Sequence, residues 1–412
     1  MSAWTIAALL AILAGAAVDA AATWLNVRAL DPEPPDDFRH VYDVERYRRS
    51  QAYTRAASRF GLMVEAMELA VLVAFWLLGG FGALDTAIRE LGMGLVPTGL
   101  LFLGALALGR TLLGLPFRWW RTFVLEERFG FNRTTPRTFW ADALKAALVG
   151  IGLATPVAAT VLWLFSTAGE AAWLWCWLAA AAWSIAVQYV APTWLLPLFN
   201  RFTPLGEGAL REAILGYARR IGFPLDGVYV IDGSRRSTKA NAFFTGFGRR
   251  KRIALFDTLT GALTPDEIVA VVAHEVGHFR RHHVLLGLVL GLVQAGLAFR
   301  LLAWALEWPP LFEAFLVPAP SAHVGLVLFG LVARPAGLAL SAALLALSRR
   351  HEYQADAFAA ETTGRPEPLA TALERLAADS LTNLTPHPLH VALHHSHPPV
   401  RARVRRLRTV AS

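Results

Sequence analysis

Residues 264–278 read TPDEIVAVVAHEVGH, and residues 284–305 read VLLGLVLGLVQAGLAFRLLAWA. The first stretch sets charged residues against a helical apolar pattern, which is typical of a helix with one face in water. The second is almost entirely apolar and reaches the roughly 20 residues that a helix needs to cross a bilayer. The two stretches together predict a water-exposed helix that leads directly into a membrane span.

The apolar pattern recurs along the whole chain of 412 residues, of which 55% are hydrophobic and 17% charged. A soluble domain typically carries about 25% charged residues, and a disordered chain combines low hydrophobicity with high net charge. Neither class fits, which leaves a polytopic membrane protein. We expect seven spanning helices, the first of them uncleaved because no basic segment precedes it: residues up to about 24, then 61–83, 92–115, 143–166, 171–198, 284–305 and 321–347.

The net charge of +8 is arginine charge, because only three of the 39 basic residues are lysine. This bias is typical of a GC-rich genome and favours a bacterial source. No basic stripe alternates with aromatic residues, so we expect no nucleic-acid partner. Arginines gather in the loops after the first and third spans and in the tail after the seventh, whereas the other loops hold Arg89 alone. Basic loops stay in the cytoplasm, so the N-terminus is predicted outside and the C-terminus inside.

Two stretches outside the spans, 199–283 and 348–412, fall on the predicted cytoplasmic side and can form one domain. The first contains an amphipathic pattern at 206–221 and short strand-like runs rich in β-branched and aromatic residues. The predicted fold class is therefore mainly α, a polytopic membrane protein with a cytoplasmic domain that contains a small β-sheet. The expected strands are 227–232, 241–247 and 252–257, and the expected divisions are 1–198, 199–283, 284–347 and 348–412.

His274 and His278 lie four residues apart on a helix that a capping box at 264–267 begins. Residues at this spacing share a helix face, so both imidazoles can bind one ion. Zn²⁺ accepts imidazole and carboxylate ligands and keeps a fourth position open in catalytic sites. Glu275 can take a proton from water there, as in H-E-x-x-H zinc peptidases, and the lone cysteine of the chain excludes a Cys-based site. The alternative interpretation is two core histidines beside a solvated glutamate.

A third protein ligand is expected just after the last span, where residues 351–356 read HEYQAD. Glu352 is the candidate, and Asp356 lies on the same helix face, where it could accept a hydrogen bond from a ligand histidine. His351 is a rival ligand, but its side chain would point about 100° away from that of Glu352. The alternative is an exposed acidic pair beside arginines.

Two further segments could act on a peptide substrate. Histidines at 387, 390, 394, 395 and 397 end in the sequence SHPP, and His397 could donate a hydrogen bond to an oxyanion. The alternative is a solvated histidine-rich loop. The run NAFFTG at 241–246 could be an edge strand that binds an extended peptide, or an ordinary buried strand.

Taken together, these motifs resemble the type I CAAX prenyl endopeptidases, the integral-membrane zinc metalloproteases that mature the yeast a-factor pheromone and prelamin A. The resemblance runs from about residue 45 to 408 and implies seven helices around a water-filled chamber, with a gluzincin-like zinc site at its cytoplasmic end. Besides the runs above, it is carried by ERYRRSQAYT at 45–54, FVLEERFGFN at 123–132 and PTWLLPLFN at 192–200.

The resemblance also implies roles for single residues. His274, His278 and Glu352 correspond to the zinc ligands, and Glu275 corresponds to the general base. Asp356 corresponds to an aspartate that hydrogen-bonds a ligand, and His397 corresponds to the histidine that stabilises the tetrahedral intermediate. Asn241 and Ala242 correspond to the strand that holds the substrate backbone. Arg403 corresponds to a substrate-contacting arginine. Leu393 and His395 depart from the tryptophan and tyrosine usual in eukaryotic members, which predicts a shifted substrate preference.

The expected partners are a peptide or protein substrate, prenylated or not, and the lipid bilayer. A heat-shock-type membrane protease would share the zinc motif but is shorter, and a site-2-type protease would hold it inside a span, which the charges at 266–267 and 280–281 oppose. Quality-control cleavage of unprenylated membrane proteins and a catalytically silent chaperone or scaffold remain the alternative functions.

Overall fold

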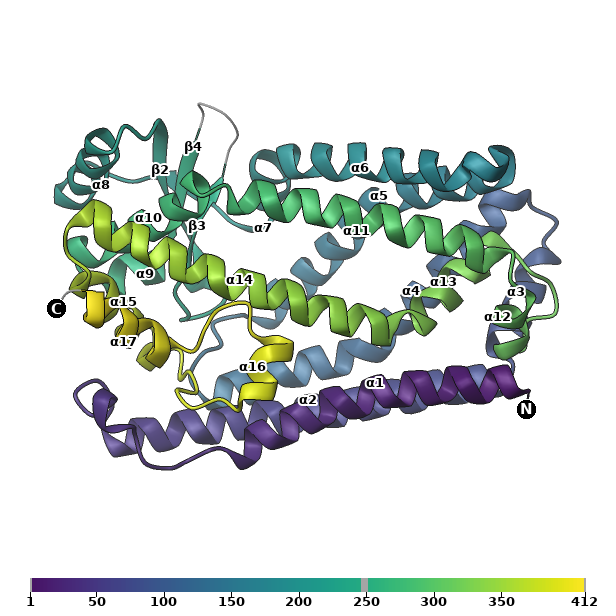
Figure 1. The fold of residues 1–412 in the computed structure, drawn as a ribbon, viewed down its shortest axis with the longest axis horizontal. Helices are drawn as coiled ribbons and strands as arrows, with labels where there is room; N and C mark the ends of the chain where they lie inside the picture. The colour runs from purple at the N-terminus through teal and green to yellow at the C-terminus, as the bar shows by residue number, and fades with distance from the viewer. Residues whose placement is uncertain (1, 246–250, 411–412) are drawn as a thin grey trace.

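In the computed structural model, residues 2–245 and 251–410 are described. Figure 1 shows an elongated molecule whose long helices run along one axis, with the small sheet gathered at one end. The N-terminus lies at the end away from the sheet and the C-terminus lies at the sheet end. An odd number of spans puts the two termini on opposite sides of a membrane, and this arrangement fits that topology.

Six helices are long and apolar enough to cross a membrane, and the bent pair α13 and α14 makes a seventh. The seven predicted spans and the mainly α membrane fold are therefore confirmed. The spans are α1 (Ala3–Arg28), α2 (Val44–Leu77), α4 with a π-helical turn (Leu95–Glu126), α5 (Pro136–Thr167), α6 with its flanking turns and α7 (Gly169–Phe199), α11 (His283–Leu306), and α13 (Ala322–Val332) with α14 (Arg334–Thr363).

Two span boundaries differ from the prediction. The expected span 61–83 ends early, because Gly79 adopts a left-handed conformation with φ of 74° and terminates α2. The expected span 321–347 is bent by 58° near its middle, at Ala333, and continues past its predicted end. Proline at the second position of α14 lacks the N–H that would continue α13. The continuation carries α14 beyond the apolar segment, so one helix joins the membrane to the site described below.

Four strands form one mixed sheet in the order β1-β2-β4-β3. Strands β2 (Leu225–Ile231) and β4 (Lys251–Phe256) pair in parallel, and β3 (Ala242–Thr245) pairs antiparallel with β4 at the sheet edge. The three predicted strands are found within two residues at their starts, although residues 246 and 247 of the second lie outside the described part. β1 (Phe202–Pro204) was not predicted, because three residues that include a proline give no strand signal.

Most of the remaining helices surround the sheet or close the opposite end. Helix α10 (Pro265–Arg280) begins with the predicted capping box and packs against α14. Its apolar residues join β4 in the main core of the sheet end. The other helices are α3 (Gly80–Arg89), α8 (Ala209–Arg220), α9 (Asp257–Ala262), α12 (Pro309–Ala314), α15 (Glu367–Asp379), α16 (Pro388–His394) and α17 (Val400–Val410).

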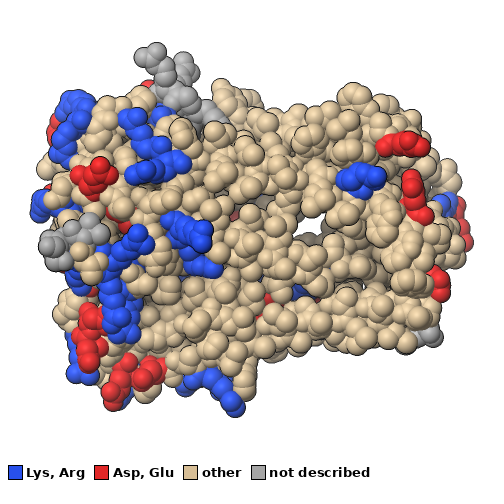
Figure 2. All heavy atoms as spheres, viewed as in Figure 1, with Lys and Arg blue, Asp and Glu red and all other residues tan. Residues whose placement is uncertain are grey.

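The charges divide the surface into two ends and a middle. Figure 2 shows basic side chains gathered over the sheet end, acidic ones mainly at both ends, and a broad band between them that carries almost no charge. An opening interrupts this band between α11 and α14. A band of this kind is what the hydrocarbon core of a bilayer requires of the protein surface.

Candidate metal centre

Two helices build the centre. Helix α10 supplies His274, Glu275 and His278, and the extension of α14 beyond the membrane supplies Glu352. Local sequence explains where α10 begins. The side chain of Thr264 accepts from the backbone N–H of Glu267 and the Glu267 carboxylate returns the contact, so the first turn of α10 is closed on both sides.

The two histidines and the glutamate converge on one point. Ligand atoms of His274, His278 and Glu352 all lie within 4.8 Å of one another, the one such group found among the described residues. The two Nε2 atoms are 3.1 Å apart, and the Glu352 carboxylate lies 3.5 Å from His274 Nε2 and 3.2 Å from His278 Nε2. The structure therefore brings the three predicted ligands together, although Glu352 lies 74 positions after His278 in the chain.

The chemistry of this group fits a metal ion. Two imidazole nitrogens and one carboxylate oxygen are a ligand set that Zn²⁺ accepts in catalytic sites. Glu352 is only 3% exposed, and its Oε2 forms no hydrogen bond with any residue that the structure describes. The Arg403 guanidinium lies 3.1 Å from this oxygen and balances its charge. His351, the rival ligand, instead stacks on His283 and does not join the group.

Glu275 lies half-buried on α10 between the two histidines. Burial raises the pKa of its carboxyl group above the usual 4.5, although both neighbouring histidines oppose this effect. A general base works best when its pKa approaches the working pH. The environment of Glu275 therefore shifts its pKa in the direction that proton transfer at neutral pH requires.

Asp356 and Arg403 lie behind His274. The Asp356 carboxylate is 2.9 Å from His274 Nδ1, and the Arg403 guanidinium donates to both of its oxygens at 2.6 and 2.9 Å. A hydrogen bond to Nδ1 leaves Nε2 of His274 free to bind an ion. Arg403 is only 6% exposed and also lies 3.1 Å from Glu352, so it balances two buried carboxylates. The substrate contact that the resemblance implies for Arg403 stays a prediction.

His397 approaches the centre from the loop between α16 and α17. Its Nε2 lies 3.3 Å from Glu352 Oε1, and its Nδ1 lies 2.8 Å from the Ser396 hydroxyl. Burial lowers the pKa of His397 below 6.5, which favours the neutral ring. Of the five histidines in this segment, the structure brings His397 alone to the metal-binding group. The carbonyl groups of Val391 and His395 accept from Arg349 on α14, a contact that sequence analysis missed because neither residue type marks it.

Asn241 and Ala242 lie where the sheet is open. Ala242 begins β3, which pairs with β4 on one side and has no partner strand on the other among the described residues. The side-chain oxygen of Asn241 accepts a hydrogen bond from the backbone N–H of Ala242. The backbone carbonyl of Asn241 accepts one from the backbone N–H of Phe256. Strand β3 also contacts α10, the helix of the metal-binding group. The predicted edge strand is therefore present and adjoins the centre.

A second contact behind the ligands was also missed. His278 Nδ1 lies 3.1 Å from His283 Nδ1, and His283 Nε2 lies 2.8 Å from the Gln354 side-chain oxygen. This chain of contacts orients His278 as Asp356 orients His274. The spacing of His283 from His278 is not a helical neighbour spacing, so only the turn between α10 and α11 reveals the pair.

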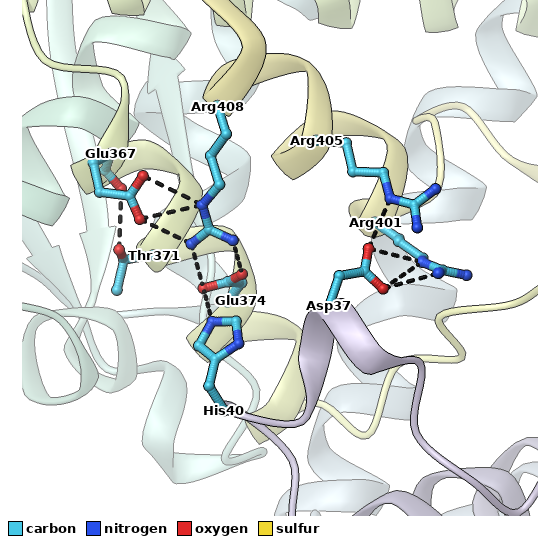
Figure 3. Close-up of polar contacts among 8 residues, drawn as sticks. All are labelled: Asp37, His40, Glu367, Thr371, Glu374, Arg401, Arg405 and Arg408. Atoms are coloured by element: carbon cyan, nitrogen blue, oxygen red, sulfur yellow. Dashed lines mark hydrogen bonds and ion pairs between the residues drawn. The ribbon is translucent and has the colours of Figure 1, made fainter. Parts of the chain in front are cut away.

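Helix α17, which carries Arg403, is held from outside by the loop between α1 and α2. Figure 3 shows Asp37 in contact with Arg401 and Arg405, and Glu374 between His40 and Arg408. The Asp37 oxygens accept from Arg401 at 2.9 and 3.0 Å and from Arg405 at 2.7 Å. The arginine-rich end of the chain is therefore bound within the protein at Arg401, Arg405 and Arg408, in addition to the buried Arg403.

Two family models together cover nearly the whole chain. Residues 24–201 match the model described as CAAX prenyl protease N-terminal, five membrane helices, and residues 204–411 match peptidase family M48. The chain is 33% identical to a CAAX prenyl protease 1 homolog of Arabidopsis thaliana, over 93% of each chain. It is 31% identical to CAAX prenyl protease 1 of Saccharomyces cerevisiae, over 88% of this chain and 85% of that protein.

A solved structure shares the fold over the same extent. The crystal structure of Ste24p from S. mikatae matches with a TM-score of 0.93 and 30% sequence identity, over 99% of each chain. The agreement extends through the membrane helices and the sheet end alike. The arrangement in Figure 1 is therefore that of a fold already seen in a crystal.

Proposed function

The chain belongs to peptidase family M48 and is an integral, multi-pass membrane metalloendopeptidase of the CAAX prenyl protease type, and we propose that its metal is one zinc ion held by His274, His278 and Glu352. The observation that carries the proposal is that ligand atoms of these three side chains lie within 4.8 Å of one another. Membership in this peptidase family argues against the alternative of a catalytically silent chaperone or scaffold.

The proposed reaction is hydrolysis of a peptide bond. When bound, zinc would polarise the scissile carbonyl and lower the pKa of a bound water towards about 7. The Glu275 carboxylate takes the proton of the attacking water and returns it to the leaving amine. His397 donates from Nε2 to the oxyanion that develops on the carbonyl, and its contact with Ser396 holds the ring for this donation.

The residues around this centre orient it. Asp356 accepts from His274 and fixes its tautomer, and Arg403 neutralises the buried carboxylates. The open edge of β3 at Asn241 and Ala242 binds the peptide substrate as an added strand. The side chains of the substrate then contact the neighbouring surfaces of the protein. In this arrangement the substrate backbone runs beside α10.

The proposed substrate is a prenylated protein delivered from the bilayer. A cavity of about 350 Å³ opens between α11 and α14 next to the metal ligands, and most of its lining surface is apolar. An apolar cavity that reaches from a membrane-facing gap to the catalytic residues suits a lipid chain attached to a peptide. The lining includes His278, His283, Leu290, Leu344 and Leu347.

The proposed orientation places the N-terminus outside and the metal centre in the cytoplasm, on the inner membrane if the source is bacterial. Basic side chains gather at the sheet end of the molecule (Figure 2), and basic segments stay on the cytoplasmic side. The proposed division into 1–198, 199–283, 284–347 and 348–412 then puts both non-membrane parts into one cytoplasmic peptidase unit.

A cleavage assay in liposomes tests the substrate. The purified protein is given a farnesylated CAAX peptide or the same peptide without the lipid. Faster cleavage of the farnesylated peptide is expected, since the apolar cavity adds binding free energy. Equal cleavage of both peptides would contradict the prenyl preference and favour quality-control cleavage of membrane proteins.

A further inference from the structure

The segment that leads into β3 is bound to the membrane helices rather than to the sheet. Residues 236–239 lie between the short helical turn that follows β2 and the open strand, and no strand of the sheet includes them. Their backbone pairs with the loop before α5. Arg133 N–H donates to Arg236 C=O at 3.0 Å, Thr238 N–H donates to Phe131 C=O at 3.2 Å, and Asn132 and Ser237 form a β-bridge.

Lys239 adds a charged contact to this segment. Its ammonium donates to the Tyr53 hydroxyl at 2.9 Å and to Glu126 Oε2 at 3.2 Å, while Tyr53 donates to Glu126 Oε1 at 2.7 Å. The ammonium also lies 4.3 Å from the centre of the Phe131 ring. Glu126 is 18% exposed and Lys239 36%, so the contact is partly shielded from water. Charge-assisted hydrogen bonds of this kind are among the strongest in proteins.

The contact joins two sequence motifs that the metal centre does not use. Tyr53 belongs to the run at 45–54, and Glu126 and Phe131 belong to the run at 123–132. Both runs are remote from the metal ligands, yet they meet at the one lysine that precedes the open strand by three residues. Lys239 C=O also accepts from Thr258 at the start of α9, so this residue is held from both sides.

An edge strand depends on such support. Strand β3 pairs with β4 alone, and a strand that binds substrate must keep its other edge free. Its position is therefore set by one ladder, by its contact with α10 and by the chain that enters it. Movement of residues 236–239 would shift the register or the angle at which β3 meets a peptide.

We propose that Lys239 is a positioning residue for substrate binding, which holds β3 in place by anchoring residues 236–239 to Tyr53 and Glu126 of the membrane helices. The inference rests on the proposed function of β3 as the strand that binds the substrate backbone. It assigns the two unused motifs a role in peptide recognition rather than in metal binding.

Lys239→Met removes the charge and keeps the length of the side chain. The expected result is a KM about tenfold higher, with kcat within about twofold of the wild type and zinc content unchanged, since one charge-assisted contact is lost outside the catalytic centre. The KM of Lys239→Arg is expected to stay close to the wild-type value, because arginine keeps the charge and the hydrogen-bond donors. Glu126→Gln is expected to raise KM as well, and the two changes combined are expected to raise it by less than the product of their single effects.

Lys145→Met is the matched control. Lys145 also lies near the boundary of the membrane helices, where it donates to Leu198 C=O at 2.8 Å and takes no part in the contact of Lys239 with Tyr53 and Glu126. Its KM is expected to stay at the wild-type value. A Lys239→Met protein with wild-type KM, or one that loses kcat while KM stays unchanged, would overturn the proposal.

Hydrogen exchange separates this inference from the proposed function. Backbone amides of β3 and β4 are expected to exchange faster in Lys239→Met than in the wild type or in Lys145→Met, whether or not a peptide is cleaved. Unchanged exchange there would overturn the positioning role. Absence of cleavage by the wild type would instead contradict the proposed function. The exchange rates would then still show whether Lys239 holds β3 in place.

Discussion

A Cβ atom added to Gly277 would lie 3.0 Å from the Cα atom of Ala355. Helix α10 therefore approaches the backbone of α14 as closely as a residue without a side chain allows. The contact lies between His274 and His278 on one helix and between Glu352 and Asp356 on the other. The glycine within the metal-binding motif is thus what lets a carboxylate from the last span reach two imidazoles on α10.

Replacement of Gly277 by alanine is expected to force the two helices apart. Overpacking of this kind costs about 1–3 kcal/mol of unfolding free energy, and it moves Glu352 away from the histidines. Thermal unfolding and zinc affinity by chelator competition measure the two effects. Gly216→Ala on α8 is the control, because no atom lies within 4 Å of its added Cβ and alanine favours the helix. Wild-type zinc affinity in Gly277→Ala would refute the importance of this contact.

Asp356→Asn is expected to weaken zinc binding by about 10- to 100-fold, the usual effect of removing a carboxylate that orients a ligand histidine. The change keeps the shape of the side chain but withdraws the charge that pairs with His274 and Arg403. Chelator competition measures the affinity. An unchanged affinity would show that His274 needs no carboxylate to bind the ion.

His397→Ala is expected to lower kcat by about 10²- to 10³-fold, the loss found when one oxyanion donor is removed. The zinc content should not change, since His397 lies 3.3 Å from a ligand oxygen but is outside the group of three. Ser396→Ala should have a smaller effect of the same kind, because it leaves the ring but removes its 2.8 Å contact. Steady-state kinetics with metal analysis distinguishes these results from a lost ion.

Asp37 is expected to stabilise the peptidase end in a pH-dependent way. Burial raises its pKa, but hydrogen bonds from Arg401 and Arg405 outweigh burial and hold the pKa below the usual 3.8. A carboxyl group with a lowered pKa in the folded state stabilises above its unfolded pKa and loses this effect as the pH falls. Asp37→Asn should therefore lower the unfolding free energy by less than about 1 kcal/mol at pH 7, because Asp37 is partly screened by water. Thermal unfolding should show this difference shrinking below about pH 4, and a difference that grows in acid would contradict the assignment.

The orientation of the protein in the membrane can be measured by labelling single cysteines introduced on each side. Cys176 is the lone cysteine and is fully buried, so the background of labelling should be low. In intact cells, a membrane-impermeant maleimide should label Glu90→Cys, while Arg219→Cys should react only after lysis, since basic segments lie in the cytoplasm. Both positions are exposed. The opposite pattern would reverse the predicted topology.

Hydropathy and helical spacing predicted the spans, the capped helix at 265–280 and the pairing of His274 with His278, because these depend on local sequence. The bend of 58° before α14 was not predicted, because it falls inside an apolar run that hydropathy treats as one span, and β1 was not predicted, because three residues that include a proline give no strand signal. His283 and Lys239 were missed for a related reason. Their partners lie far along the chain or across a turn, and neither residue stands in a recognisable spacing to them.

The central claim is zinc-dependent hydrolysis with Glu275 as the base, and Glu275→Gln tests it most directly. Wild type and variant are purified in the same detergent, and zinc content and peptide cleavage are measured on the same samples. The account predicts one zinc per chain in both and a loss of turnover of about 10²- to 10⁴-fold in the variant. Near wild-type turnover by Glu275→Gln at full zinc content would contradict it.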